Sequence, residues 1–146
     1  MGENKVGAPS KYTDDIPQKM LDYFDIEATR TVYDKMYDKK GNMIAEKERE
    51  VANSLPTIEG FCKLINVSKN TLHEWLKDDS KVELQDAYKK AKDMQEAVWQ
   101  ENSLKGLYNP IFTIFMGKNV FGWKDKQEIS VEAKHVLFEG EDKIPD

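Results

Sequence analysis

The stretch 57–77, TIEGFCKLINVSKNTLHEWLK, decides the fold of this chain, because it predicts two short helices joined by a sharp corner. Thr57 and Ser68 can cap these helices, since a hydroxyl at a helix start accepts a hydrogen bond from a free backbone amide. Asn66 tolerates the left-handed conformation that ends a helix, and Gly60 lets a helix approach its neighbour closely. The stretch therefore predicts a helix-turn-helix.

The outward face of the second helix is polar, and such a face can enter the major groove of DNA. Lysines would contact phosphates, whereas an asparagine suits the edge of an adenine. The alternative is an ordinary helical hairpin whose polar face is solvated. We predict DNA contacts from six residues: Lys63, Lys69 and Lys77 at phosphates, and Asn70, Thr71 and His73 at base edges.

The net charge limits this interpretation. The chain has 22 Lys and Arg against 27 Asp and Glu, a formal charge of −5, whereas a DNA-binding protein that acts as a monomer usually has a basic excess. Within 57–77, three lysines outnumber only two glutamates. One copy would bind nucleic acid weakly, so either several copies act together or the motif contacts protein.

Two elements precede the motif, and the first is a short helix behind a mobile arm. Residues 1–12 are rich in Gly, Pro, Ser and Lys, which predicts the arm. Asp14 or Asp15 can cap the helix, and Pro17 is acceptable in its first turn. The apolar face of this helix consists of Met20, Leu21 and Phe24.

The second element is a β-hairpin, because residues 29–51 alternate around the sequence KKGN. Gly41 falls in the turn. A two-residue turn of Lys40 and Gly41 gives a register with two opposite-charge pairs, whereas a one-residue slip sets two acids against each other. The preferred register places Lys35 opposite Glu46 and Asp34 opposite Lys47.

One face of the predicted hairpin is aromatic. Tyr33 and Tyr37 share this face with Lys35, and such a face can stack on nucleic-acid bases. The other interpretation, which we favour, is a half-exposed aromatic face that packs on the chain's own domain.

Two helices follow the motif. The first spans about 81–107, since its apolar positions step by three and four. Pro110 opens the second, which is apolar nearly all round and ends near Gly117 or Asn119, where a left-handed residue is expected. A chain of this size can scarcely cover such a helix, so self-association is the simplest solution. The residues predicted to be buried between copies are Leu84, Tyr88, Ala91, Met94, Val98, Leu104, Ile111, Phe112, Ile114 and Phe115.

The end of the chain holds two candidate strands, 127–131 and 135–139, which need partners to be stable, and then an acidic tail. The predicted fold is mainly α with a small β component. Its parts are a mobile arm (1–12), a DNA-binding region with the hairpin and the helix-turn-helix (13–79), an antiparallel helical oligomerisation core (80–120), and C-terminal strands with the acidic tail (121–146).

Signatures of catalysis are missing from the sequence: it has no phosphate-binding Gly-rich loop, HExxH, CxxC or nucleophile elbow. His73 and His135 stand far apart without a ligand set, so no metal and no other cofactor is expected. The single cysteine, Cys62, fits a reducing compartment. The chain lacks both the apolar core of a signal peptide and a stretch that could span a membrane. We expect a cytoplasmic protein that binds and assembles and is not an enzyme.

The order of the parts along the chain is informative in itself. Tyr23-Phe24 in the first helix, the charged hairpin, LPTIEGFCKLINVSKNTLHEWLK (55–77) and NPIFTIFMGKNVFGWKDKQEISVE (109–132) follow one another along the chain. The most specific of these stretches is VFGWKDKQ (120–127). Over about residues 16–132, the chain resembles the small terminase subunits of tailed double-stranded-DNA bacteriophages.

This resemblance implies a non-enzymatic component of a viral DNA-packaging motor in the cytoplasm of the bacterial host. Such subunits assemble into rings, bind the packaging-initiation site on double-stranded viral DNA, and recruit and regulate the large terminase subunit, which carries the ATPase and nuclease. A ring would present many weak DNA-binding faces at once, which accommodates the modest charge of each copy. Its C-terminal strands would pair around the ring axis. Because this chain ends in acidic residues where other members carry a basic tail, contact through the helix-turn-helix and an arm with Lys5 and Lys11 is favoured.

Two other functions fit the same residues. The first is a dimeric helix-turn-helix transcriptional regulator of a phage or prophage, which would read palindromic half-sites about one helical turn apart. The second is an assembly protein whose helix-turn-helix binds protein. The mass in solution and the affinity for DNA at low salt would separate the three.

Overall fold

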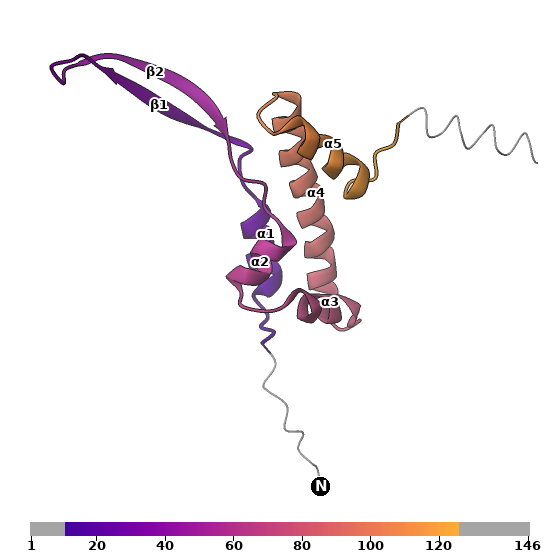
Figure 1. Ribbon diagram of the computed structural model, residues 1–146. Helices are drawn as coiled ribbons and strands as arrows, with labels where there is room; N and C mark the ends of the chain where they lie inside the picture. The colour runs from indigo at the N-terminus through magenta and orange to yellow at the C-terminus, as the bar shows by residue number, and fades with distance from the viewer. Residues whose placement is uncertain (1–10, 126–146) are drawn as a thin grey trace, which may run out of the picture. The chain divides into compact units, whose positions relative to one another are not determined.

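The computed structural model describes residues 11–125, which contain five α-helices and one two-stranded antiparallel sheet (Figure 1). In chain order the elements are α1 (Ile16–Phe24), β1 (Thr29–Tyr37), β2 (Met43–Ala52), α2 (Ile58–Leu64), α3 (Lys69–Lys77), α4 (Val82–Leu104) and α5 (Pro110–Asn119). The predicted helix-rich fold with a small β component is confirmed. The candidate strands at 127–131 and 135–139 and most of the predicted arm lie outside the described residues.

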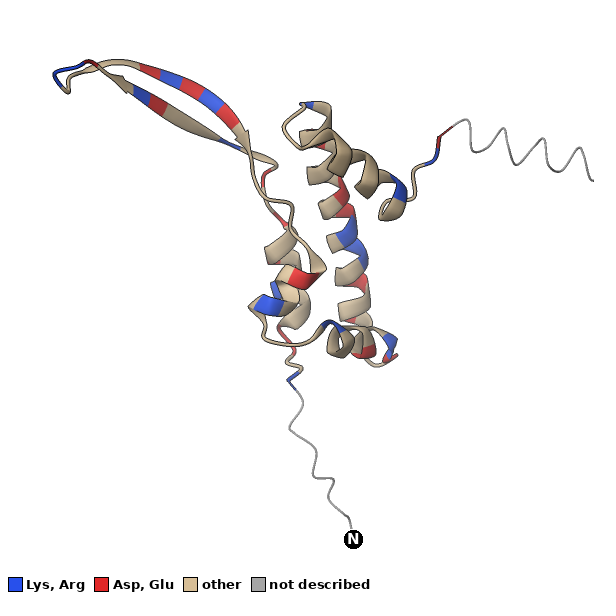
Figure 2. Cartoon of the chain, in the orientation of Figure 1, with Lys and Arg blue, Asp and Glu red and all other residues tan. Residues whose placement is uncertain are grey.

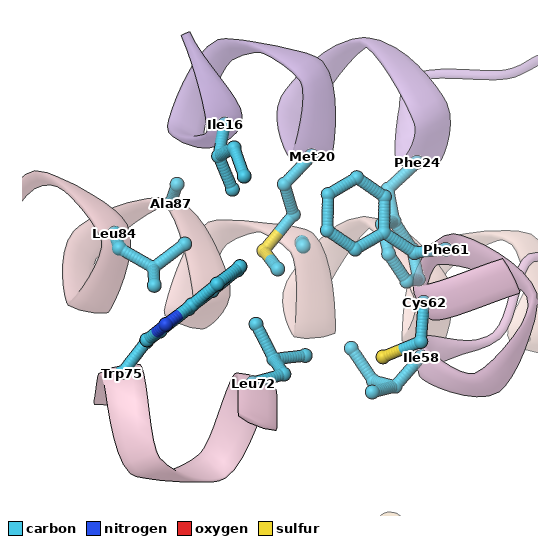
Figure 3. Close-up of a cluster of buried hydrophobic side chains, with 11 residues drawn as sticks. Ile16, Met20, Phe24, Ile58, Phe61, Cys62, Leu72, Trp75, Leu84 and Ala87 are labelled. Carbon is cyan, nitrogen blue, oxygen red and sulfur yellow. The ribbon is translucent and has the colours of Figure 1, made fainter. Parts of the chain in front are cut away.

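The chain forms two compact units, the first ending at Leu107 and the second beginning at Tyr108. The core of the first unit lies where α1 packs along α4 and the α2–α3 pair closes over them (Figure 3). Met20 and Phe24 come from α1, and they lie one helical turn apart, as the sequence pattern predicts. The largest fully buried side chains of the described chain are Phe24, Phe61, Met20, Leu72, Leu84 and Asn102.

The long helix α4 corrects the predicted oligomerisation core. Leu84 and Ala91 are fully buried in the core of the first unit, and Val98 is also buried. Tyr88 and Met94 are partly buried against the same core. Leu84, Ala91 and Val98 are therefore buried within this chain and are not available to another copy, whereas Leu104, at the end of the helix, is 82% exposed. The sequence pattern marked a buried face correctly, but it carried no information on which surface covers that face.

Glycines and an asparagine set the ends of the last two helices. Gly106, at φ +70°, ends α4 in a Schellman motif. In this motif the Gly106 amide donates to the carbonyl of Ser103, and the Leu107 amide donates to the carbonyl of Asn102. The predicted end at residue 107 is therefore three residues too late. Asn109 caps α5, since its side chain accepts hydrogen bonds from two backbone amides of the first turn. After α5 the left-handed residue is Gly122, at φ +75°, and neither Gly117 nor Asn119 as predicted.

The hairpin has the predicted register. Asp34 lies opposite Lys47 and Lys35 lies opposite Glu46. The turn itself differs from the two-residue form, because a bulge after Met36 shifts the last pair, and Asp38 accepts hydrogen bonds from the amides of the turn. The register expected from the cross-strand charges is therefore observed although the predicted turn type was wrong, and the ion pair that Asp34 makes is with Arg49, a neighbour of the directly opposite Lys47.

Two buried amides of α4 hold the root of the hairpin. Asn102 Nδ2 donates to the carbonyl of Ala28, just before β1, at 2.8 Å. Gln95 Nε2 donates to the carbonyl of Pro56, after β2, at 2.9 Å. The two amides are seven residues apart and so lie on one face of the helix. They fix both ends of the segment that contains the hairpin.

Candidate nucleic-acid interface

The corner between α2 and α3 is built by local hydrogen bonds that the sequence predicts. The Gly60 amide donates to Thr57 Oγ1 at 3.0 Å, and the Thr71 amide donates to Ser68 Oγ at 3.1 Å. Asn66 adopts a φ of 57°, the left-handed conformation expected of it. Thr57 therefore sets where α2 begins, Asn66 follows its end, and Ser68 sets where α3 begins.

The buried side of α3 orients its outer face. Leu72 is fully buried, and Trp75 packs edge-on against the ring of Tyr12 with the centroids 5.1 Å apart. The ammonium of Lys81 lies 4.9 Å from the centroid of the same ring, and partial burial raises the pKa of the Tyr12 hydroxyl. Tyr12 is therefore part of the folded unit, which corrects the predicted arm at its C-terminal end.

Two of the three predicted phosphate contacts are already paired with acids. Lys69 Nζ lies 2.8 Å from Glu59 Oε1, and Lys77 Nζ lies 3.2 Å from Glu74 Oε1. The Lys69 hydrogen bond lowers the pKa of the Glu59 carboxyl and raises that of the Lys69 ammonium. Lys63 is exposed, and it makes no ion pair within residues 11–125. The surface around α2 and α3 thus carries both signs of charge (Figure 2).

The three predicted base contacts differ in how accessible they are. Asn70 is exposed in the first turn of α3, and its amide makes no hydrogen bond within the described chain. Thr71 is half-buried, and its hydroxyl is engaged with that of Ser68 at 2.9 Å. His73 is half-buried. Of the three, only Asn70 combines an exposed side chain with unused donors and acceptors.

Two further lysines lie beside the corner. Lys11 Nζ donates to the carbonyl of Asn66 at 3.2 Å, so the end of the predicted arm lies at the corner. Lys92 of α4 is close enough for its charge to lower the pKa of Glu59. Sequence reasoning missed Lys92, because its proximity depends on how α4 packs on α2, and no local pattern reports that.

The described residues hold no group of three or more His, Cys, Asp or Glu side chains that could bind a metal ion. The free thiol of Cys62 is buried, and burial raises its pKa. Across the same part of the chain, every helix is too short or too polar to cross a membrane.

Comparison with known proteins gives one family match and one related phage protein. Residues 7–129 match the family model described as DNA-packaging protein gp3. The chain is also 33% identical, over 86 residues, to protein p17 of Acyrthosiphon pisum secondary endosymbiont phage 1. That alignment covers 59% of this chain and 61% of p17, less than two thirds of the relative's length. No solved structure matches the chain. Since the family model spans most of its length, the chain belongs to the DNA-packaging protein gp3 family.

Proposed function

We propose that this packaging protein is a terminase small subunit. It assembles into a ring, binds the packaging-initiation site on double-stranded viral DNA in the host cytoplasm, and recruits and regulates the large terminase subunit. It has no catalytic activity of its own, and it needs no cofactor. The family match supports a role in packaging. The order of the chain's parts, from the first helix to 120–127, supports the small-subunit assignment.

The observation that carries the assembly part of the proposal is the apolar surface of α5. Ile111 is 80% exposed, and Ile114 and Phe115 are each more than half exposed. Burial of such side chains contributes about 1.5–3 kcal/mol each, so a surface of this kind favours association strongly. Phe112 belongs to the same surface of α5. Leu104, which is 82% exposed at the end of α4 in the first unit, is the other residue that we retain from the predicted set.

DNA binding is assigned to the outer face of α3, with the α2–α3 pair acting as a helix-turn-helix. In such motifs the N-terminal residues of the second helix contact base edges, and this is where Asn70 lies. Lys63 and Lys11 contact phosphates. Lys69 and Lys77 contribute less per copy, because each exchanges an ion pair with a glutamate for one with a phosphate. Weak binding by each copy is overcome by the number of copies in the ring.

Binding to viral DNA fragments, measured by fluorescence anisotropy over a range of salt concentrations, tests this assignment. K63A weakens binding and lowers the salt slope by about 1 for each phosphate that the lysine no longer neutralises. K69A also weakens binding, whereas E59Q releases Lys69 and strengthens it. K89A, on an exposed position of α4, is the matched control and leaves both quantities unchanged.

Two results would contradict the assignment. If K63A and K69A bind DNA like the wild type and with the same salt slope, the α2–α3 face is not the DNA contact. If the wild-type chain is a dimer that prefers palindromic sites about one helical turn apart, the protein is a regulator of transcription instead.

A further inference from the structure

The hairpin offers a large surface that the helices of its own unit leave open. Every residue from Gly41 to Glu50 is exposed, and so are most residues of β1. A two-stranded sheet is marginally stable by itself, so a ribbon of this length gains from being covered. This surface includes Tyr33 and Tyr37, which are 58% and 57% exposed, so the predicted half-exposed aromatic face is confirmed, but neither ring belongs to the core of the unit.

The two faces of the hairpin carry opposite charge. Residues directly opposite each other share a face, and successive residues alternate between faces, so the register sorts the charged side chains into two sets. In Figure 2 this alternation is visible as red and blue bands along β2. The acidic face holds Glu46, Glu48 and Glu50 with Lys35, and the basic face holds Arg30, Lys47 and Arg49 with Asp34.

Only part of this charge is satisfied inside the chain. Glu50 is paired with Lys105, the residue after α4, at 2.6 Å, and Arg49 is paired with Asp34 at 2.7 Å. Glu46, Glu48 and Lys47 make no ion pair with any other residue of the described chain. The net charge that remains is therefore negative on the acidic face, where Glu46 and Glu48 outnumber Lys35, and positive on the basic face, which keeps Lys47 and Arg30.

We propose that the basic face of one hairpin docks on the acidic face of the hairpin of the next copy. This inference rests on the proposed ring, because a contact between two different faces is head-to-tail and closes into a ring when it is repeated by rotation. The two faces of the hairpin are then the surfaces by which one copy recognises the next copy in the ring. The exposed apolar tip, with Met36, Tyr37, Met43 and Ile44, is covered in the same contact.

Charge complementarity favours a second copy over two other occupants. Pairing of strand edges between hairpins would place acidic faces beside acidic faces and basic beside basic, which is repulsive. DNA would be attracted by the basic face, but the acidic face on the other side of the same thin ribbon would repel it. A second copy satisfies both faces with the charges that the chain itself provides.

The root of the hairpin makes this contact repeatable. Asn102 and Gln95 hold the segments that flank the strands, and the Lys105–Glu50 pair ties β2 to the end of α4. Arg30 donates to Asn53 Oδ1 at 2.8 Å across the base of the two strands. Each copy therefore presents its two faces in the same direction relative to its own α4, which is what identical contacts around a ring require.

Charge reversal in the full chain tests the inference by analytical ultracentrifugation. The acidic-face variant E46K/E48K and the basic-face variant K47E/R49E each have two faces of like sign, so each self-associates about tenfold more weakly than the wild type. An equimolar mixture of the two restores assembly, because each variant then offers the face that the other lacks. A hairpin that had merely unfolded could not be rescued in this way. Controls with the same charge change on exposed positions of α4 are E83K/D93K and K89E/K90E, which assemble like the wild type.

The outcomes separate the hairpin contact from the ring. If both variants assemble as well as the wild type, the hairpin contact is wrong but the proposed ring is unaffected. The same holds if the mixture assembles no more strongly than either variant alone. A wild type that stays monomeric overturns both. If assembly is unchanged while K47E/R49E loses DNA affinity and E46K/E48K gains it, the occupant of the hairpin is DNA.

Discussion

Gly60 of α2 lies in close contact with Tyr23 of α1. A Cβ built at this position would lie 2.2 Å from the hydroxyl of Tyr23 and 3.1 Å from Thr57 Oγ1. The Tyr23 ring is itself held between Phe24 and Phe61, at centroid distances of 5.1 and 5.8 Å, so it cannot easily move away. A single missing side chain thus permits the close packing that places α2, and with it the corner and α3.

Replacing Gly60 tests this close contact. We expect G60A to lower the free energy of unfolding by about 1–3 kcal/mol, the usual cost of overpacking, in spite of the better helix propensity of alanine. The double variant G60A/Y23F removes the clashing hydroxyl, and it recovers part of the loss. Urea denaturation followed by circular dichroism measures both. A G60A chain as stable as the wild type would show that the contact is not tight.

Asp78, at the junction of α3 and α4, makes the free energy of unfolding depend on pH. Hydrogen bonds from Lys81 and Ser80 hold the pKa of the Asp78 carboxyl below its ordinary value of 3.8. The pKa of Asp78 is lower in the folded chain than in the unfolded chain. The ionised carboxylate therefore stabilises the fold at pH values above the unfolded pKa, and this stabilisation is lost as the pH falls through the folded pKa. D78N is therefore less stable than the wild type at pH 7, and the difference narrows below about pH 4.

Urea denaturation at several pH values measures this effect. The control is D79N, at an exposed neighbour that makes no hydrogen bond within residues 11–125. If the gap between D78N and the wild type is the same at pH 7 and at pH 3, the Asp78 interactions do not carry the pH dependence.

At the scale of elements, the attachment of the hairpin depends on buried polar contacts and little on apolar ones. Asn102 is fully buried, and its Nδ2 binds the carbonyl of Ala28, which also accepts the amide of Asn53 from the end of the strands. Its Oδ1 has no partner in the described part of the chain. A buried amide with one unsatisfied oxygen is costly, so its presence indicates that the contact it does make is important for the fold.

Removing this amide should loosen the root of the hairpin. N102A leaves a cavity and a buried carbonyl with one donor fewer, and we expect it to lower the free energy of unfolding by about 1–3 kcal/mol. Hydrogen exchange at the hairpin amides should quicken more than exchange in α1. The matched control is Q100A, an exposed amide on the same helix. Equal exchange rates in the hairpin of N102A and of the wild type would contradict the role of Asn102.

Elements determined by neighbours in sequence were predictable, and contacts between distant residues were not. The caps at Thr57 and Ser68, the left-handed Asn66 and the start of α5 at Pro110 depend on a few adjacent residues. The strand register was predictable, because charge pairs distinguish it from its alternatives.

The predicted DNA-binding face shows the limit of such reasoning. The pairing of Lys69 with Glu59 joins residues on two helices, and Lys11 reaches the corner across 55 residues of sequence. The sequence also could not show which surface covers the apolar face of α4, because an apolar stripe packs equally well on its own chain or on another. Each of these contacts depends on how distant segments of the chain pack together, which the local sequence does not show.

At the scale of the whole molecule, the chain divides its apolar surface between two uses. In the first unit it forms a core around Phe24 and Leu84, whereas α5 in the second unit leaves Ile111 and Ile114 exposed. We expect I111D/I114D to abolish assembly while the helical content remains near that of the wild type, since the core of the first unit does not use these side chains. L64D places the same change on an exposed leucine of α2 and leaves assembly intact.

The mass of the wild-type chain in solution, measured by light scattering after size-exclusion chromatography, tests the proposed packaging ring most directly. We predict a single species whose mass is one fixed multiple of the 16.9 kDa chain, well above two, over a wide range of concentration. A monomer, or a dimer that does not grow at high concentration, would contradict the ring.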